Sequence, residues 1–165
     1  MLSTGTTDLI VIWMSVITAY LTPHLFDIWD LSRTGFRQTE IAEKLGISRQ
    51  TVNKALQEAT AKVTRALTEA ATINKIAIES IDSTNGLLMG WSQEFSVKTV
   101  ISVTKKDGMQ VWYEHVADCN HCLRYSSCQA YLFRCAKERG IKLDKERKKM
   151  IPSELAQVIF GMVKK

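Results

Sequence analysis

The amino-acid sequence predicts an α+β fold that is mainly helical. Three observations carry this prediction. A stretch without Gly or Pro, residues 49–81, follows several helix-capping signals near the N-terminus. Apolar and polar residues then alternate over residues 95–113, on either side of an Asp-Gly pair. Finally, four cysteines fall within the 17 residues from Cys119 to Cys135, where helical signals resume.

The composition is that of a soluble globular protein. The chain has 165 residues, of which 45% are hydrophobic and 24% charged. Such values exclude a disordered or fibrous chain. The length corresponds to one domain or two small ones and can bury a core without disulfides. We expect three parts: residues 1–67 with the first helices, a linking helix over 68–85, and a C-terminal part over 86–165.

The most apolar stretch, from Leu9 to Leu21, is 13 residues long. A bilayer span needs about 20 residues. A signal peptide needs basic residues before its apolar part. Here the preceding residues include Asp8 and contain no Lys or Arg. We therefore expect a buried helix or strand, or a dimer contact, and no membrane association. Thr22 and Pro23 then begin a helix that ends near Gly35.

A short helix is expected over residues 38–45, followed by Gly46 and by Ser48 as a new N-cap. Within residues 49–81, small and apolar residues repeat every seven positions along two rows. The rows are Leu56, Val63, Ala70 and Ala77, and Ala59, Ala66, Ile73 and Ser80. We interpret them as the seam of a long helix that pairs two copies of the chain. The alternative is a helix packed along its own C-terminal part.

The C-terminal part begins with a predicted β-hairpin. Residues 95–104 and 109–113 alternate, and Asp107-Gly108 is a two-residue turn signal. Capping residues mark the helices that follow: Ser126 or Ser127 at the start of one helix, Gly140 at its end and Pro152 at the start of the last one.

Charge is unevenly distributed, although the net charge is only +5. Residues 31–67 contain seven basic and three acidic side chains, and residues 119–165 contain eleven and four. Residues 1–30 and 68–118 are acidic instead. Concentrated positive charge favours an anionic partner, the alternative being solvated helix faces.

Residues 38–56 combine the features of a helix-turn-helix. Ala42 is small enough for two helices to cross closely, and Gly46 accepts the positive φ of a tight turn. Val52, ten positions after Ala42, directs the second helix back onto the first. The remaining core positions are Ile41, Leu45, Ile47 and Leu56.

The stretch from Leu21 to Leu67 resembles the helix-turn-helix of LuxR-type regulators and of sigma factor region four, and among archaeal proteins the Tfx-type regulators. The likeness is carried by LTP at its start, by EIAEKLGIS, and by TV inside the second helix. It implies sequence-specific binding to double-stranded DNA, normally as a homodimer.

In this geometry the second helix enters the major groove by its N-terminal end. The side chains expected to face base edges are Arg49, Gln50, Asn53 and Lys54. Gln and Asn suit adenine edges, while Arg and Lys suit guanine. Phosphate contacts are expected from Arg37, Thr39, Ser48 and Thr51. The alternative is a three-helix module for protein contacts.

The cysteines follow the pattern Cys-x2-Cys-x5-Cys-x6-Cys: Cys119, Cys122, Cys128 and Cys135. Four thiolates suit a [4Fe–4S] cluster or structural zinc. Cys128 and Cys135 would lie on one helix face, about 10 Å apart along the axis, which favours the bulkier cluster. Zinc, which prefers paired Cys-x2–4-Cys knuckles, is the alternative, ahead of free thiols or disulfides. The spacing alone resembles the cluster loop of endonuclease III-type glycosylases.

Four basic residues surround the cysteines: Arg124, Arg134, Lys137 and Arg139. They would offset the charge of a thiolate-bound metal, reach DNA phosphate or remain solvated. The β-hairpin and helices around this cluster form the expected sensor domain.

We expect a homodimeric, cytoplasmic transcription regulator that senses redox state, oxygen or iron–sulfur status through a [4Fe–4S] cluster. The alternative is a DNA-binding regulator or adaptor with a purely structural zinc site. We expect no enzymatic activity, because the sequence shows no nucleophile–base set or phosphate-binding loop. A thiol–disulfide enzyme would need a βαβ context around Cys119 and Cys122, which the sequence lacks.

Overall fold

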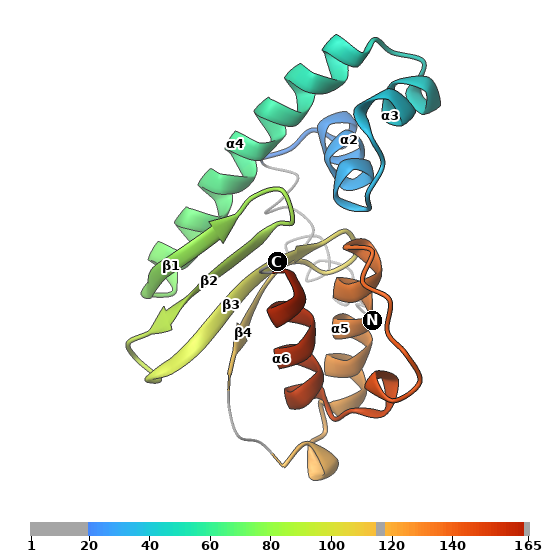
Figure 1. Ribbon diagram of the computed structural model, residues 1–165. Helices are drawn as coiled ribbons and strands as arrows, with labels where there is room; N and C mark the ends of the chain where they lie inside the picture. The colour runs from blue at the N-terminus through green and yellow to red at the C-terminus, as the bar shows by residue number, and fades with distance from the viewer. Residues whose placement is uncertain (1–19, 115–117, 164–165) are drawn as a thin grey trace, which may run out of the picture.

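The computed structural model describes residues 20–114 and 118–163. Its helices are α2 (Pro23–Arg33), α3 (Gln38–Leu45), α4 (Arg49–Ile73), α5 (Tyr125–Glu138) and α6 (Pro152–Val163), with single 3-10 turns η1 (Cys119–His121) and η2 (Arg147–Lys149). Its strands are β1 (Ile76–Asp82), β2 (Leu87–Ser92), β3 (Val97–Thr104) and β4 (Gly108–Tyr113). The fold is α+β and mainly helical, as predicted (Figure 1). Residues 9–19 of the predicted apolar element lie outside the described residues.

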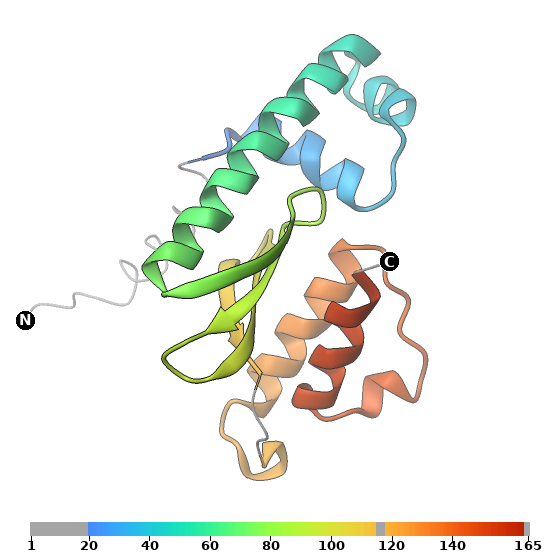
Figure 2. The ribbon, with the colours of Figure 1, turned by 60° about the vertical axis from the view of Figure 1, so that its left-hand side comes forward.

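The four strands form one antiparallel sheet in the order β1-β2-β3-β4. Helices α2 and α4 lie against one face of the sheet, and α5 and α6 against the other (Figures 1 and 2). Successive strand residues point to opposite faces. Leu88 and Ile101 therefore join the core shared with α2, α3 and α4, whereas Leu87 joins the core of α5 and α6.

The predicted helix-turn-helix boundaries are confirmed. Thr22 caps α2 by accepting a hydrogen bond from the Leu25 amide, and Pro23 is the first helical residue. Gly46 ends α3 in the left-handed region, with φ of 66°. Ser48 caps α4 by accepting a hydrogen bond from the Thr51 amide at 3.0 Å. Each boundary is set by a local backbone requirement, so the sequence predicts it well.

The prediction that the long helix extends to residue 81 is wrong. Helix α4 ends at Ile73, Lys75 turns the chain with a φ of 53°, and β1 begins at Ile76. The last members of the two heptad rows, Ala77 and Ser80, therefore lie on a strand. The density of β-branched residues after Lys75 favours a strand over further helix.

The small residues of the predicted dimer seam pack inside the chain. Ala59 and Val63 are buried in the core that α4 shares with α2 and the sheet, and Ala66 is also buried. This is the alternative of a helix packed along its own C-terminal part. The same core joins the helix-turn-helix to β1, β2 and β3. The predicted domain boundaries at residues 67 and 85 stay a prediction.

The predicted hairpin is confirmed as β3 and β4, and it belongs to a larger sheet than expected. The sequence predicts neither β1 nor β2, because residues 76–81 continue the helical spacing and residues 83–90 indicate only a break after it. The turn between β3 and β4 has three residues, 105–107, followed by Gly108 at φ of 67°, because Thr104 pairs with Gly108. A turn of this kind is the common three-residue hairpin loop.

Helix α6 begins at Pro152 as predicted, and Gly140 follows α5 with a φ of 66°. The predicted caps of α5, Ser126 and Ser127, are wrong. The N-cap is Arg124, and Ser127 donates instead to the Arg124 carbonyl at 2.9 Å.

Candidate DNA-binding surface and the four cysteines

Helices α3 and α4 are held at a fixed crossing by a small apolar core. Ile41 and Val52 are completely buried, and Ala42 lies between the helices with 8% of its surface exposed. The Ile47 amide donates to the Ala42 carbonyl at 3.0 Å, which closes the turn. Because α4 is anchored by Val52 and the buried Ala55, its opposite face in the first turns must point outward.

The outward face carries the four predicted base-reading residues. Arg49, Gln50, Asn53 and Lys54 are all exposed. They belong to the first turns of α4, which lie at the end of the molecule away from α5 and α6 (Figure 1). Asn53 Oδ1 accepts a weak hydrogen bond from Gln38 Nε2 at 3.4 Å, so this face includes the start of α3. These side chains therefore share the exposed face at the start of α4, where a partner can reach them.

The predicted phosphate-contacting residues lie at the edges of the same surface, and three of them already have local partners. Ser48 and Thr51 hydroxyls share a hydrogen bond of 2.9 Å. The exposed Arg37 pairs with Glu40 at 3.0 Å, and its hydrogen bond lowers the pKa of that carboxyl. Thr39 is exposed. The residues at the starts of α3 and α4 thus both order the helix ends and offer polar groups to a phosphate.

Sequence reasoning did not single out Lys44, which adds a further cation on α3. Its ammonium lies 5.4 Å from the centre of the Phe36 ring, and both residues are exposed. Phe36 is an aromatic residue left in solvent between α2 and α3. The pairing could not be foreseen because it depends on the turn between the two helices.

A buried arginine network connects the helix-turn-helix to the C-terminal part. Arg33, at the end of α2, donates to the Val103 carbonyl at 2.7 Å and pairs with Asp30 at 2.5 Å and Glu138 at 2.6 Å. Its guanidinium also lies 4.4 Å over the Trp29 ring. Arg33 Nε is the one buried side-chain nitrogen or oxygen that lacks a partner in the described part of the chain.

Arg139 completes this network from the end of α5. It donates to four backbone carbonyls, those of Asn85, Gly86, Val103 and Cys135. Arg134 forms two hydrogen bonds of 2.7 Å with Asp107 in the β3–β4 turn. From the sequence, both arginines could be counter-charges to a metal site, phosphate contacts or solvated residues. The structure assigns both to internal contacts, while Arg124 and Lys137 are exposed.

Three of the four cysteines lie at the same end of the C-terminal part. Cys119 is buried in η1 and donates to the Ser153 hydroxyl at 3.6 Å, Cys122 is exposed, and Cys128 is half-buried in α5. Burial raises the pKa of the Cys128 thiol, although the nearby Arg124 guanidinium acts to lower it. The three residues lie in η1, at its C-cap and in the first turn of α5, respectively.

Cys135 lies apart from them. It is completely buried two turns along α5, where its thiol lies 3.6 Å from the Ser102 hydroxyl on β3 and beside Tyr131. Burial raises the pKa of this thiol as well. None of the four cysteines forms a disulfide.

The residues described by the structure contain no group of three or more His, Cys, Asp or Glu side chains arranged to hold a metal ion. His121 instead forms a 2.6 Å contact with Asp118. The expected gathering of four thiolates is thus not seen. The cysteine spacing predicted such a group because it shows which face of a helix each residue occupies. It does not show which other elements pack against that face.

Comparison with known proteins identifies the helix-turn-helix. Residues 31–58 match the family model described as a bacterial regulatory protein of the Fis family. The match covers the end of α2, all of α3 and the start of α4. No curated protein and no solved structure matches the chain. None of the described helices is long and apolar enough to cross a membrane. The chain therefore carries the DNA-binding helix-turn-helix of a regulator, and the LuxR-type, sigma-factor and Tfx-type likeness stays a resemblance.

Proposed function

We propose that this protein regulates transcription in the cytoplasm by reading duplex DNA with the start of α4. The observation that carries the proposal is the exposed row of Arg49, Gln50, Asn53 and Lys54 on a helix anchored by buried Val52. Amide side chains can bond adenine edges in the major groove in a bidentate manner. The basic charge of residues 31–67 supplies attraction to phosphate.

Replacing Gln50 or Asn53 by alanine should relax base specificity at one position of the operator. Each bidentate contact contributes about 1–3 kcal/mol of discrimination against the wrong base. The measurement is a gel-shift competition, at fixed salt, against operators chosen by selection from random duplexes. Gln57→Ala is the matched control, because Gln57 is exposed on the same helix beyond the anchored first turns. Unchanged preference in both variants would remove these residues from the readout.

A homodimer is part of the proposal, because helix-turn-helix proteins usually read two half-sites with two copies. The contact must use a surface other than the Ala59–Val63–Ala66 row, which is buried within the chain. Sedimentation of the free protein and of its DNA complex measures the stoichiometry directly. Two copies per operator would support the dimer, and one copy per operator would reject it.

We further propose that the cysteines bind a metal centre that makes the regulator sensitive to redox state, oxygen or iron–sulfur status. A [4Fe–4S] cluster is the first candidate and structural zinc the second. Support comes from the four-cysteine spacing and from the placement of Cys119, Cys122 and Cys128 in η1, at its C-cap and in the first turn of α5. Thiolates are the ligands that both centres take. Cys135, the fourth predicted ligand, lies in the core instead of beside the other three.

Purification without oxygen, followed by a visible spectrum and assays of iron, sulfide and zinc, tests this proposal. We expect a coloured protein with iron and sulfide, and Cys128→Ala should lose the metal because it removes one of the four proposed thiolate ligands. A colourless protein with one zinc per chain would select the structural site. A colourless protein without metal would reject both. Metal content that is unchanged in Cys135→Ala would exclude Cys135 as a ligand.

A further inference from the structure

A cavity of about 340 Å³ lies between α6 and the sheet, on the face away from the helix-turn-helix. Pockets for small molecules commonly have volumes of about 300–1,000 Å³. The inner wall is apolar and is formed by Met89, Val100, Trp112 and Phe160. The Trp112 and Phe160 rings are tilted at 59° with their centres 6.4 Å apart, so they form a corner that can hold an apolar group.

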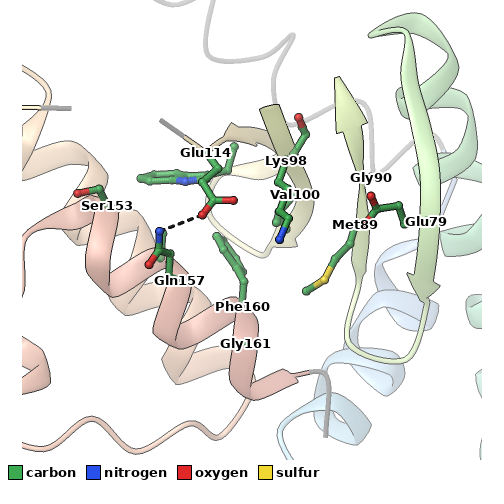
Figure 3. A pocket seen from close by; sticks show the side chains of 13 residues that line it. Glu79, Met89, Gly90, Lys98, Val100, Glu114, Ser153, Gln157, Phe160 and Gly161 are labelled. Atoms are coloured by element: carbon green, nitrogen blue, oxygen red, sulfur yellow. Dashed lines mark hydrogen bonds between the residues drawn. The ribbon is translucent and has the colours of Figure 1, made fainter. Parts of the chain in front are cut away.

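Charged and polar side chains surround this apolar wall (Figure 3). Glu114 lies on one side, where its carboxylate accepts a hydrogen bond of 2.9 Å from Gln157 on α6. Glu79 of β1 lies on the other side, and Lys98 of β3 lies between them. Lys98 lies opposite Glu114, whose amide donates to the Lys98 carbonyl at 2.8 Å, but among the described residues no ion pair joins the Lys98 ammonium to Glu79 or Glu114. Separate charges of both signs thus face one cavity.

Helix α6 leaves this space open by carrying Gly161 in its last turn. A Cβ atom at Gly161 would have no neighbour within 4 Å, so no packing contact demands glycine there. Glycine inside a helix is less favourable than alanine by about 1 kcal/mol. The residue lines the cavity, and the absence of a side chain keeps room for another molecule.

We propose that this cavity binds a free amino acid with an apolar side chain. The Glu114 carboxylate and the Gln157 amide oxygen would take the ammonium group, and Lys98 would take the carboxylate. The apolar side chain would lie against Met89, Val100 and Phe160. Lys98, Glu79 and Gln157 are exposed at the mouth of the cavity, so a ligand with both charges can pair with them there while its apolar part lies against the inner wall. The inference does not depend on DNA binding or on a metal.

Isothermal titration of the full chain with L-phenylalanine, L-leucine and L-methionine tests the proposal. At least one should bind, while phenethylamine, which lacks the carboxylate, and 3-phenylpropionate, which lacks the ammonium, should bind far more weakly. Lys98→Met should weaken amino-acid binding by about tenfold or more, as for loss of a charge-assisted hydrogen bond. Lys142→Met, at an exposed lysine outside the cavity, is the charge-matched control.

Gly161 provides a second pair of variants that do not alter charge. Gly161→Leu should abolish binding by filling the cavity, whereas Gly161→Ala, which adds one methyl group in open space, should retain it. A circular dichroism spectrum confirms that both variants fold. The proposal is overturned if no amino acid of the panel binds, if phenethylamine binds as well as L-phenylalanine, or if Gly161→Leu binds like the unaltered protein.

Discussion

Replacement of Arg33 by alanine is expected to lower the free energy of unfolding by about 3–5 kcal/mol, since breaking a buried ion pair strands the remaining charges. The Arg33 side chain is fully buried, and its carboxylate partners on Asp30 and Glu138 are only 20% and 16% exposed. The Val103 carbonyl keeps a second donor in Arg139. The loss of stability therefore comes mainly from Asp30 and Glu138, which lose their cationic partner. Urea denaturation measures their combined effect on the free energy of unfolding.

The matched control is Arg37→Ala, four positions further along. Arg37 also pairs with a glutamate three residues away, but its side chain is 80% exposed. Water and salt screen such a pair, so its removal should change the unfolding curve little. If Arg33→Ala unfolded at the same urea concentration as Arg37→Ala, the buried network would not hold α2 against α5.

Gly90→Ala is the second substitution with a large expected effect. A Cβ atom there would approach the Ala77 carbonyl oxygen too closely and would lie 2.6 Å from Ile76 Cγ2, both on β1. A backbone oxygen cannot rotate away, so β1 and β2 would have to separate next to the irregularity at Ile78. Overpacking of this kind costs about 1–3 kcal/mol.

Thermal unfolding of Gly90→Ala and of Gly161→Ala, side by side, measures the difference between a crowded and an open glycine. The Gly161 variant should be neutral or more stable by up to about 1 kcal/mol, because alanine favours helix. A loss of stability at Gly161 would contradict the open space around that residue, and unchanged stability of Gly90→Ala would contradict the close approach between β1 and β2.

The N-terminal third of the fold could be predicted because its signals are local. Thr22-Pro23, Gly46 and Ser48 each satisfy a backbone requirement within three or four residues of themselves, and all three mark the ends of helices in the structure. The same holds for the Asp107-Gly108 turn, where only the loop length differs. The exposed face of α4 followed from Val52, since one buried residue fixes the direction of the rest.

Strand β1 could not be predicted because its sequence satisfies a helical pattern too, and the glycines at 86 and 90 around β2 indicate only a break in the helix. Ala77 and Ser80 continue the seven-residue spacing of α4, and no Gly or Pro interrupts it. The break comes from Lys75, a non-glycine residue with positive φ, which sequence rules do not favour. Pairing of Ile76–Asp82 with β2 overrides the local helical spacing.

The cysteines and the cavity show a different limit. The spacing of Cys128 and Cys135 correctly places both on α5, yet Cys135 points into the core against Ser102, a contact 33 residues apart in sequence. The cavity likewise brings together Glu79, Lys98 and Gln157 from three separate elements. Non-local contacts of this kind leave no periodic signal in the chain.

Helix α4 runs unbroken from the proposed base-reading residues to Ile73 beside the sheet, about 37 Å at about 1.5 Å per residue. Its buried residues extend from Val52 to Ala71, so neither end can rotate alone. The orientation of the base-reading face about the helix axis is therefore fixed relative to the sheet. Each residue inserted into α4 would rotate that face about the helix axis by about 100°. Substitutions at Gln50 or Asn53 can change the bases that are read without changing this orientation. Insertions or deletions in α4 would preserve the orientation of the base-reading face only in steps of about seven residues, or two helical turns.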